Sequence, residues 1–202
     1  MEAYKICACN TCDLPDSYIE ANHLGIVSLS YKFGEDVYRR GDQELSEPVF
    51  YGKLRAGQHA ETEPISYEYA KQFFEEILTE TTCILQIAFS SGLSASCLNL
   101  QRAADALMKK KKGIKIIVID SLCASLGEGL LVHRAVELKK KGKTMEEVAA
   151  WLDAHKQNLV HAFTVDDIYH LYLGDRISKA SAVVGSVVNT KPCSIWTTQE
   201  TL

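Results

Sequence analysis

Apolar, strand-like runs alternate with amphipathic helical patterns through the middle of this chain. The runs at 83–89 and 114–119 are followed by helical patterns at 95–111 and 124–141. Continuous apolar runs separated by helices are typical of parallel strands that are covered on both faces. We therefore predict an α/β fold built on a mostly parallel sheet, with helices on both faces of that sheet.

The segments before residue 83 are predicted to add further strands and helices. Thr144 and Glu147 form a capping box that predicts one more helix after residue 143. The earlier segments are a strand at 4–9, a helix from Pro15, a strand at 26–33 with a hairpin return at 37–39, and two helices capped by Ser46 and Ser66.

The regular pattern stops in the last quarter of the chain. We predict a strand at 160–165, a helix of small residues at 179–188 and a strand at 191–198. A strand needs neighbours to be stable, so these elements do not complete a sheet by themselves. We therefore divide the chain into an α/β lobe at 1–159 and the start of a second α/β lobe at 160–202, whose remainder we expect beyond this chain.

Two strand-to-helix junctions carry hydroxyls and glycines. The first junction holds Ser90, Ser91, Gly92 and Ser94, and the second holds Ser121. In open α/β sheets, ligands bind beyond the carboxyl ends of the strands, and free N–H groups at a helix start attract anions. We predict a site for an acidic small molecule here. The alternative is that these serines are only caps and turn residues.

Charge and composition exclude several classes of partner. The formal net charge is −4, which argues against nucleic acid, and the lysine runs at 109–112 and 139–141 are expected to be solvated helix ends. The chain has neither a signal-peptide pattern nor an apolar run of the ~18–20 residues that a membrane span needs. We expect a cytoplasmic protein that is not embedded in the membrane.

The seven cysteines are scattered through predicted core segments, which is typical of reduced thiols. Cys7, Cys9 and Cys12 are closely spaced, but no second cysteine pair or histidine motif follows to complete a metal site. We therefore expect neither a metal nor a cofactor. Cys12 precedes a predicted helix start, so its pKa is expected to be lowered and its thiol to be reactive.

Seven short motifs follow one another along the chain. They are 9–15 (CNTCDLP), 50–54 (FYGKL), 61–64 (ETEP), 90–96 (SSGLSAS), 120–129 (DSLCASLGEG), 174–178 (GDRIS) and Lys191-Pro192. Their order resembles that of the DegV family of bacterial fatty-acid-binding proteins, and the resemblance covers essentially the whole chain.

The resemblance implies a carrier that holds a long-chain fatty acid and presents its carboxylate to a separate fatty-acid kinase. It places the head group on a hydroxyl of the Ser-Ser segment and on the loop at 61–64, which correspond here to Ser91 and Thr62. The family's arginine in the turn that faces the kinase corresponds to Arg176. The resemblance implies no catalytic residue in this chain and a role in phospholipid metabolism.

This chain departs from the family pattern at three motifs. Cys9 and Asn10 replace an Asp-Ser pair, which removes a carboxylate. Glu61 replaces a hydroxyl beside Thr62, and a carboxylate there would repel a bound fatty carboxylate if it faced the head group. Asp175 replaces a glycine in the turn before Arg176.

Two alternatives to the carrier remain open. The first is a binding or enzyme domain for a small polar acid or ketone, related by fold to the dihydroxyacetone kinases. The second is a vestigial or interaction domain without a ligand. Lipid extracted from the purified protein distinguishes the three hypotheses.

Overall fold

The computed structural model describes residues 4–165, 168–174, 177–179 and 193–196. Its contacts divide the chain into two units, Met1–Lys156 and Gln157–Leu202. None of the helices in the described ranges combines the length and the apolar character that a bilayer span requires.

A four-stranded parallel sheet forms the centre of the first unit, as predicted. Its strand order is β2-β1-β6-β7, with β1 at Tyr4–Cys9, β2 at Gly25–Val27, β6 at Cys83–Ala88 and β7 at Lys115–Asp120. All six residues of β6 are buried, because this strand has neighbours on both sides and helices above and below it. Burial on both faces explains why its sequence is a continuous apolar run.

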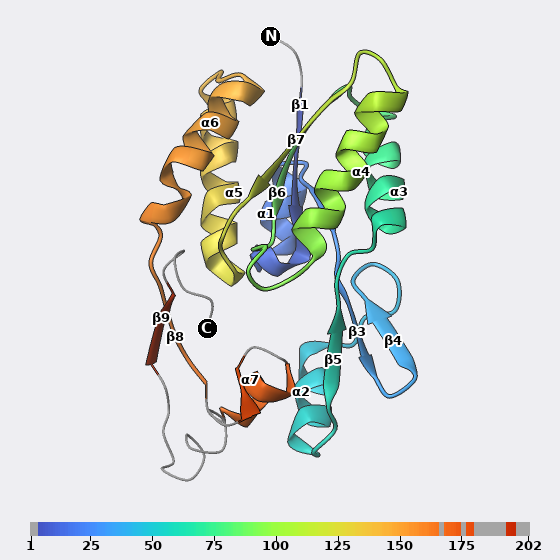
Figure 1. The fold of residues 1–202 in the computed structure, drawn as a ribbon, viewed down its shortest axis with the longest axis vertical. Coiled ribbons are helices and arrows are strands. Elements are labelled where there is room, and N and C mark those ends of the chain that lie inside the picture. The colour runs from blue at the N-terminus through green and yellow to red at the C-terminus, as the bar shows by residue number, and fades with distance from the viewer. Residues whose placement is uncertain (1–3, 166–167, 175–176, 180–192, 197–202) are drawn as a thin grey trace. The chain divides into compact units, whose positions relative to one another are not determined.

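Helices cover both faces of this sheet (Figure 1). One face is covered by α3 (Tyr67–Ile77) and α4 (Ser96–Lys110), and the other by α5 (Ser125–Lys140) and α6 (Met145–His155). Phe74, Leu100 and Leu107 pack in the core on the α3 and α4 side. The predicted α/β architecture with helices on both faces is confirmed.

Several predicted helix ends are confirmed in atomic detail. The Ser66 hydroxyl accepts a hydrogen bond from Tyr69 N at 3.2 Å, and Thr144 and Glu147 form the reciprocal capping box of α6. The lysine runs begin in the last turns of α4 and α5, where positive charge is favourable, and continue just past the helix ends. Ser46 stands at the N-cap of α2 (Glu47–Arg55), but its side chain makes no capping hydrogen bond.

The predicted single strand at 26–33 is wrong. The chain leaves the parallel sheet after Val27, and the next strand, β3 (Ser30–Phe33), belongs to a separate antiparallel sheet. Between the two strands, the Leu29 amide donates to the side-chain oxygen of Asn10 at 3.0 Å instead of to a neighbouring strand. The alternating pattern is the same in both sheets, so it did not reveal this break.

The antiparallel sheet has the order β4-β3-β5, with β4 at Asp36–Arg39 and β5 at Ala60–Glu63. The hairpin between β3 and β4 was predicted, whereas β5 was expected to be a loop. Tyr31 of β3 stacks on Tyr38 and meets Phe50 of α2 edge-on, with ring centroids 5.4 and 5.1 Å apart. This aromatic cluster lies on one face of the small sheet.

The remaining elements are short. A 3-10 turn, η1 (Asn10–Cys12), and helix α1 (Asp16–Ala21) follow β1, and a second 3-10 turn, η2 (Lys156–Asn158), follows α6. In the second unit β8 (His161–Thr164) pairs antiparallel with β9 (Cys193–Trp196), and α7 spans Tyr169–Leu173. Most of the predicted helix at 179–188 lies outside the described residues. That residues 160–202 begin a second lobe stays a prediction.

Candidate functional site

Three loops meet at the carboxyl edge of the parallel sheet. They follow β1, β6 and β7, three neighbouring strands that all end on this side. Direct hydrogen bonds tie them together: Ser90 N donates to Cys123 O at 3.2 Å, and Phe89 N donates to the Cys9 sulfur at 3.4 Å. The two serine-rich junctions therefore form one continuous edge.

The backbone N–H groups of the first junction are all used within the chain. Ser91 N donates to Asp120 Oδ1 at 3.1 Å, Gly92 N donates to the Ser90 hydroxyl at 3.2 Å, and the amides of Leu93 and Ser94 donate to Ser90 O. The expectation of free amides for an anion is therefore wrong for residues 90–94. A ligand at this junction would depend on side-chain hydroxyls.

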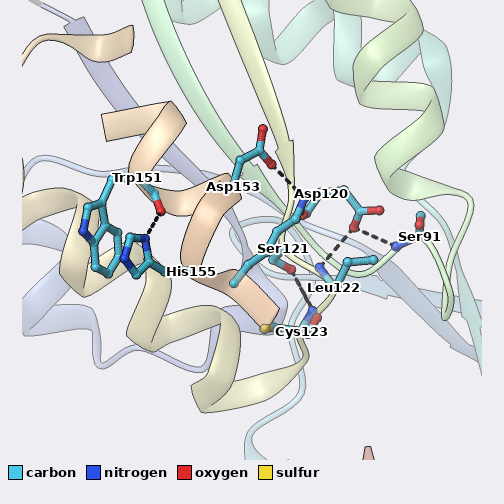
Figure 2. A network of polar contacts seen from close by, with 9 residues as sticks. Ser91, Asp120, Ser121, Leu122, Cys123, Trp151, Asp153 and His155 are labelled. Atoms are coloured by element: carbon cyan, nitrogen blue, oxygen red, sulfur yellow. Dashed lines mark hydrogen bonds and ion pairs between the residues drawn. The ribbon is translucent and has the colours of Figure 1, made fainter. Parts of the chain in front are cut away.

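Asp120 connects the two junctions (Figure 2). Its Oδ1 atom accepts hydrogen bonds from Ser91 N at 3.1 Å and from Leu122 N at 3.2 Å. Its backbone oxygen accepts a hydrogen bond from Lys156 Nζ at 2.9 Å, and the same ammonium group pairs with Asp153 at 2.8 Å. These contacts fix the second junction, although the Asp120 side chain is only partly buried.

Three of the predicted site hydroxyls have partners within the chain. The Ser90 hydroxyl accepts from Gly92 N, and the Ser121 hydroxyl accepts from Cys123 N at 3.1 Å and donates to Cys123 O. The Ser94 hydroxyl bonds to that of Ser96 at 2.9 Å. Ser90 and Ser121 are also buried, so these groups shape the loops.

Ser91 and Thr62 differ from these serines. Both residues are exposed, and neither hydroxyl bonds to any described part of the chain. Gly92, beside Ser91, is exposed as well. Of the predicted site residues, Ser91 and Thr62 are therefore the two whose hydroxyls are available to a ligand.

Contacts between α4 and Ile65, in the loop after β5, hold the segments of Thr62 and Ser91 together. Ile65 N donates to the buried Ser96 hydroxyl at 3.0 Å, and the Asn99 side chain donates to Ile65 O at 2.9 Å. Ile65 is three residues after Thr62, and the Ser96 hydroxyl bonds to Ser94 in the same loop as Ser91. The antiparallel sheet is thereby anchored to the carboxyl edge of the parallel sheet.

Glu61 and Thr62 lie on opposite faces of the small sheet, because successive strand residues alternate. Thr62 is opposite Tyr31, on the face that carries the aromatic cluster, and Glu61 is opposite Lys32. Glu61 pairs with the Lys32 ammonium group at 3.1 Å. The carboxylate of Glu61 is thus directed to the face opposite Thr62 and is balanced by a cation.

Glu128 is a buried carboxyl group that the sequence patterns did not single out. It projects from the first turns of α5 to the end of β1, where Oε1 accepts from Cys9 N at 3.3 Å and Oε2 accepts from the Thr11 hydroxyl at 2.7 Å. Burial raises its pKa to about 8. The Glu128 carboxyl group therefore lies at the end of β1, where Cys9 and Asn10 carry no carboxylate of their own.

The prediction that Cys12 has a lowered pKa is wrong. The residue is fully buried, and burial raises the pKa of its thiol to about 11. Cys7 and Cys9 are buried too, and their pKa values are raised for the same reason. Within the described ranges no three His, Cys, Asp or Glu side chains are grouped to hold a metal ion. Asp175 and Arg176 lie outside the described residues.

Comparison with known proteins identifies the family. The family model for the uncharacterised DegV proteins matches residues 4–200. A DegV domain-containing protein of Clostridium perfringens is 34% identical over 197 residues, which are 95% of this chain and 66% of that protein. A relative from Lactococcus lactis is 33% identical over 190 residues, covering 94% and 66% of the two chains.

Solved structures of the family share the fold. A fatty-acid-binding DegV protein from Thermus thermophilus superimposes with a TM-score of 0.83 at 27% identity, covering 98% of this chain and 69% of that one. A stearic-acid-binding protein from Eubacterium ventriosum gives a TM-score of 0.87 at 25% identity, with 96% and 67% covered. The chain spans about two thirds of the length of these relatives. Sequence and structure together show that the chain belongs to the DegV family.

Proposed function

We propose that this chain is a carrier for a long-chain fatty acid, whose head group is held by the hydroxyls of Ser91 and Thr62. The observation that carries the proposal is that some of the predicted site hydroxyls are hydrogen-bonded within the chain and others are not. Those of Ser90, Ser94 and Ser121 are engaged within the chain, whereas those of Ser91 and Thr62 bond to no described residue. Related proteins of the same fold bind fatty acids, which supports this choice of ligand.

Apolar surface at the carboxyl edge supports a ligand with an alkyl tail. Leu98 in the first turn of α4 is 51% exposed, and Leu126 and Leu130 in the first turns of α5 are 64% and 50% exposed. An alkyl tail that lies against these side chains removes their apolar surface from water, which is favourable. An alkyl chain gains ~0.8 kcal/mol for each buried methylene, so the tail supplies most of the affinity.

The hydroxyls supply orientation. A hydrogen bond to an ionised group contributes ~1.5–3 kcal/mol, so two hydroxyls define where the head group lies without dominating the free energy of binding. The position of the head group at an exposed loop also suits a carrier, because a second protein can reach it there. We propose that a separate kinase phosphorylates the bound carboxylate and that this chain supplies no catalytic group.

The proposal is tested by identifying what the purified protein carries. The chain is expressed, purified without detergent and extracted, and the extract is analysed by mass spectrometry beside a native mass spectrum of the intact complex. We expect a long-chain fatty acid at a ratio near one per chain. A bound polar metabolite, or an empty protein that also fails to take up added palmitate, would overturn the proposal.

A further inference from the structure

The carboxylate of Asp120 lies beside the proposed head-group position. Its Oδ1 atom is 3.1 Å from the Ser91 amide, so it holds the backbone of the residue whose hydroxyl faces the ligand. The other carboxylate oxygen accepts no hydrogen bond from the described residues, and the side chain is partly exposed. A ligand oxygen on the Ser91 hydroxyl would therefore share its immediate surroundings with a second carboxylate.

The neighbouring charges do not neutralise Asp120. Lys156 is the nearby cation, but its ammonium group is bonded to the Asp120 backbone oxygen and to the carboxylate of Asp153. The ammonium group is thus paired with the Asp153 carboxylate, and the Asp120 carboxylate has no cationic partner among the described residues.

The other titratable groups around Asp120 are neutral at pH 7. The thiols of Cys97 on α4 and Cys123 before α5 interact electrostatically with Asp120, and burial raises the pKa of each to about 12. Glu128 on α5 interacts with Cys123 as well and is protonated, because its pKa is about 8. The surplus negative charge beside Ser91 is therefore that of the Asp120 carboxylate.

Like charges at close range favour the neutral form of one of them. An ionised fatty carboxylate at Ser91 would be repelled by Asp120, whereas a protonated acid or a primary alcohol would meet no such repulsion. At an effective dielectric constant between protein surface and water, two unit charges ~6 Å apart interact by ~1–3 kcal/mol.

We propose that Asp120 is a specificity-determining residue: it positions Ser91 through the amide hydrogen bond, and its charge makes the site favour uncharged head groups over ionised carboxylates. This inference rests on the proposed function and deepens it, since it states which form of the head group the site selects.

The test compares an acid with an alcohol of the same chain length. Calorimetric titrations of dodecanoic acid and 1-dodecanol are made at pH 6 and pH 8 on the 202-residue chain and on Asp120→Asn. Asparagine keeps a side-chain oxygen for the amides of Ser91 and Leu122 but removes the charge. Asp105→Asn is the matched control, because Asp105 is exposed on α4 about 13 Å along the helix from Ser96.

We expect Asp120→Asn to increase the affinity for dodecanoic acid about three- to tenfold at pH 8 and less at pH 6. The affinity for the alcohol should stay within twofold of the wild-type value. In the wild type the affinity for the acid should fall as the pH rises. Asp105→Asn should change the affinity for neither ligand. An unchanged pH profile in Asp120→Asn, or weaker binding of the acid, overturns the inference. If the wild type binds no fatty acid at all, the proposed function itself fails.

Discussion

The Thr11 hydroxyl donates a hydrogen bond of 2.7 Å to Glu128 Oε2, which joins the turn after the first strand to the first turns of α5. The Glu128 side chain is fully buried, and its other oxygen accepts the Cys9 amide. Only two hydrogen bonds compensate this burial, so the charged form is disfavoured and the pKa rises to about 8. The group is thus mainly protonated at neutral pH, and its ionisation is coupled to stability.

Glu128 should make the stability of the chain decrease as the pH rises. Its folded-state pKa is about 8, against an ordinary pKa of 4.5 for this group, so the folded state holds the proton more tightly than the unfolded state. The stabilisation is complete below pH 4.5 and is lost as the pH rises to about 8. Each pKa unit corresponds to about 1.4 kcal/mol, so the total effect is of the order of a few kcal/mol.

Glu128→Gln should remove this pH dependence. Glutamine can accept the Cys9 amide and donate to Thr11 Oγ1, but it does not ionise. Urea unfolding followed by tryptophan fluorescence at pH 5.5, 7 and 8.5 measures the free energy of unfolding of both proteins. Exposed Glu44 provides the control Glu44→Gln, which should keep the wild-type profile. Parallel profiles for wild type and Glu128→Gln would contradict the prediction.

Ser91→Ala should weaken fatty-acid binding about ten- to a hundredfold. At pH 8, where the acid is ionised, the variant removes one hydrogen bond to a charged head group, and such a bond contributes ~1.5–3 kcal/mol. Titration with a fluorescent fatty acid measures the change. Ser46→Ala is a suitable control, because Ser46 is exposed and its hydroxyl makes no capping bond, so affinity and stability should both be retained. Equal affinities of wild type and Ser91→Ala would remove Ser91 from the site.

Substitutions at two adjacent positions of β5 should have different effects. Thr62→Val removes the hydroxyl on the aromatic face and should weaken binding severalfold. Glu61→Thr should leave the affinity within twofold, because Glu61 faces away from Thr62 and is paired with Lys32. The same titration compares both. If Glu61→Thr instead tightens binding, the carboxylate does reach the head group and the face assignment does not hold in the bound state.

Arg176→Ala tests the proposed partner surface. Arginine suits bidentate contact with carboxylate or phosphate, and the motif at 174–178 resembles the family turn that faces the kinase. We expect normal folding and lipid content but impaired transfer of the bound acid to an acyl kinase, measured as acyl-phosphate formation. Exposed Lys179 supplies the control for general loss of charge, Lys179→Ala. Loss of the bound lipid in Arg176→Ala would place Arg176 in the binding site.

The regular parts of the fold could be predicted because local patterns encode them. The buried strand at Cys83–Ala88 is a continuous apolar run, and Thr144 and Glu147 form the capping box that begins α6. The break after Val27 could not be predicted, because the alternating pattern continues across it. The hydrogen bond found at the break joins Leu29 to Asn10, nineteen residues away.

The sequence predicted which residues lie at the candidate site, but it did not predict what each side chain does there. Sequence placed five candidate residues at the two junctions, yet only the structure shows that Ser90 and Ser121 bond internally whereas the Ser91 hydroxyl does not. The local pattern did not indicate a buried role for Glu128, because the residue lies between two glycines on a helix predicted to be amphipathic. Its burial depends on the turn after β1, which lies more than a hundred residues earlier.

The glycine beside Glu128 should be required for this same contact. A Cβ atom on Gly129 would lie 2.4 Å from Cys12 O, and because that oxygen belongs to the backbone of η1, it cannot move away as a flexible side chain can. Gly129→Ala should therefore destabilise the protein by about 1–3 kcal/mol, although alanine is the better helix former.

Gly52→Ala is the matched control, because Gly52 lies within α2 and a Cβ atom there meets nothing within 4 Å. Helix propensity alone should make this variant neutral or more stable by about 0.5–1 kcal/mol. Urea unfolding at pH 5.5, where Glu128 is protonated, compares the two variants with wild type. If Gly129→Ala is as stable as Gly52→Ala, α5 can shift away from η1, and the close approach that buries Glu128 is not required for folding.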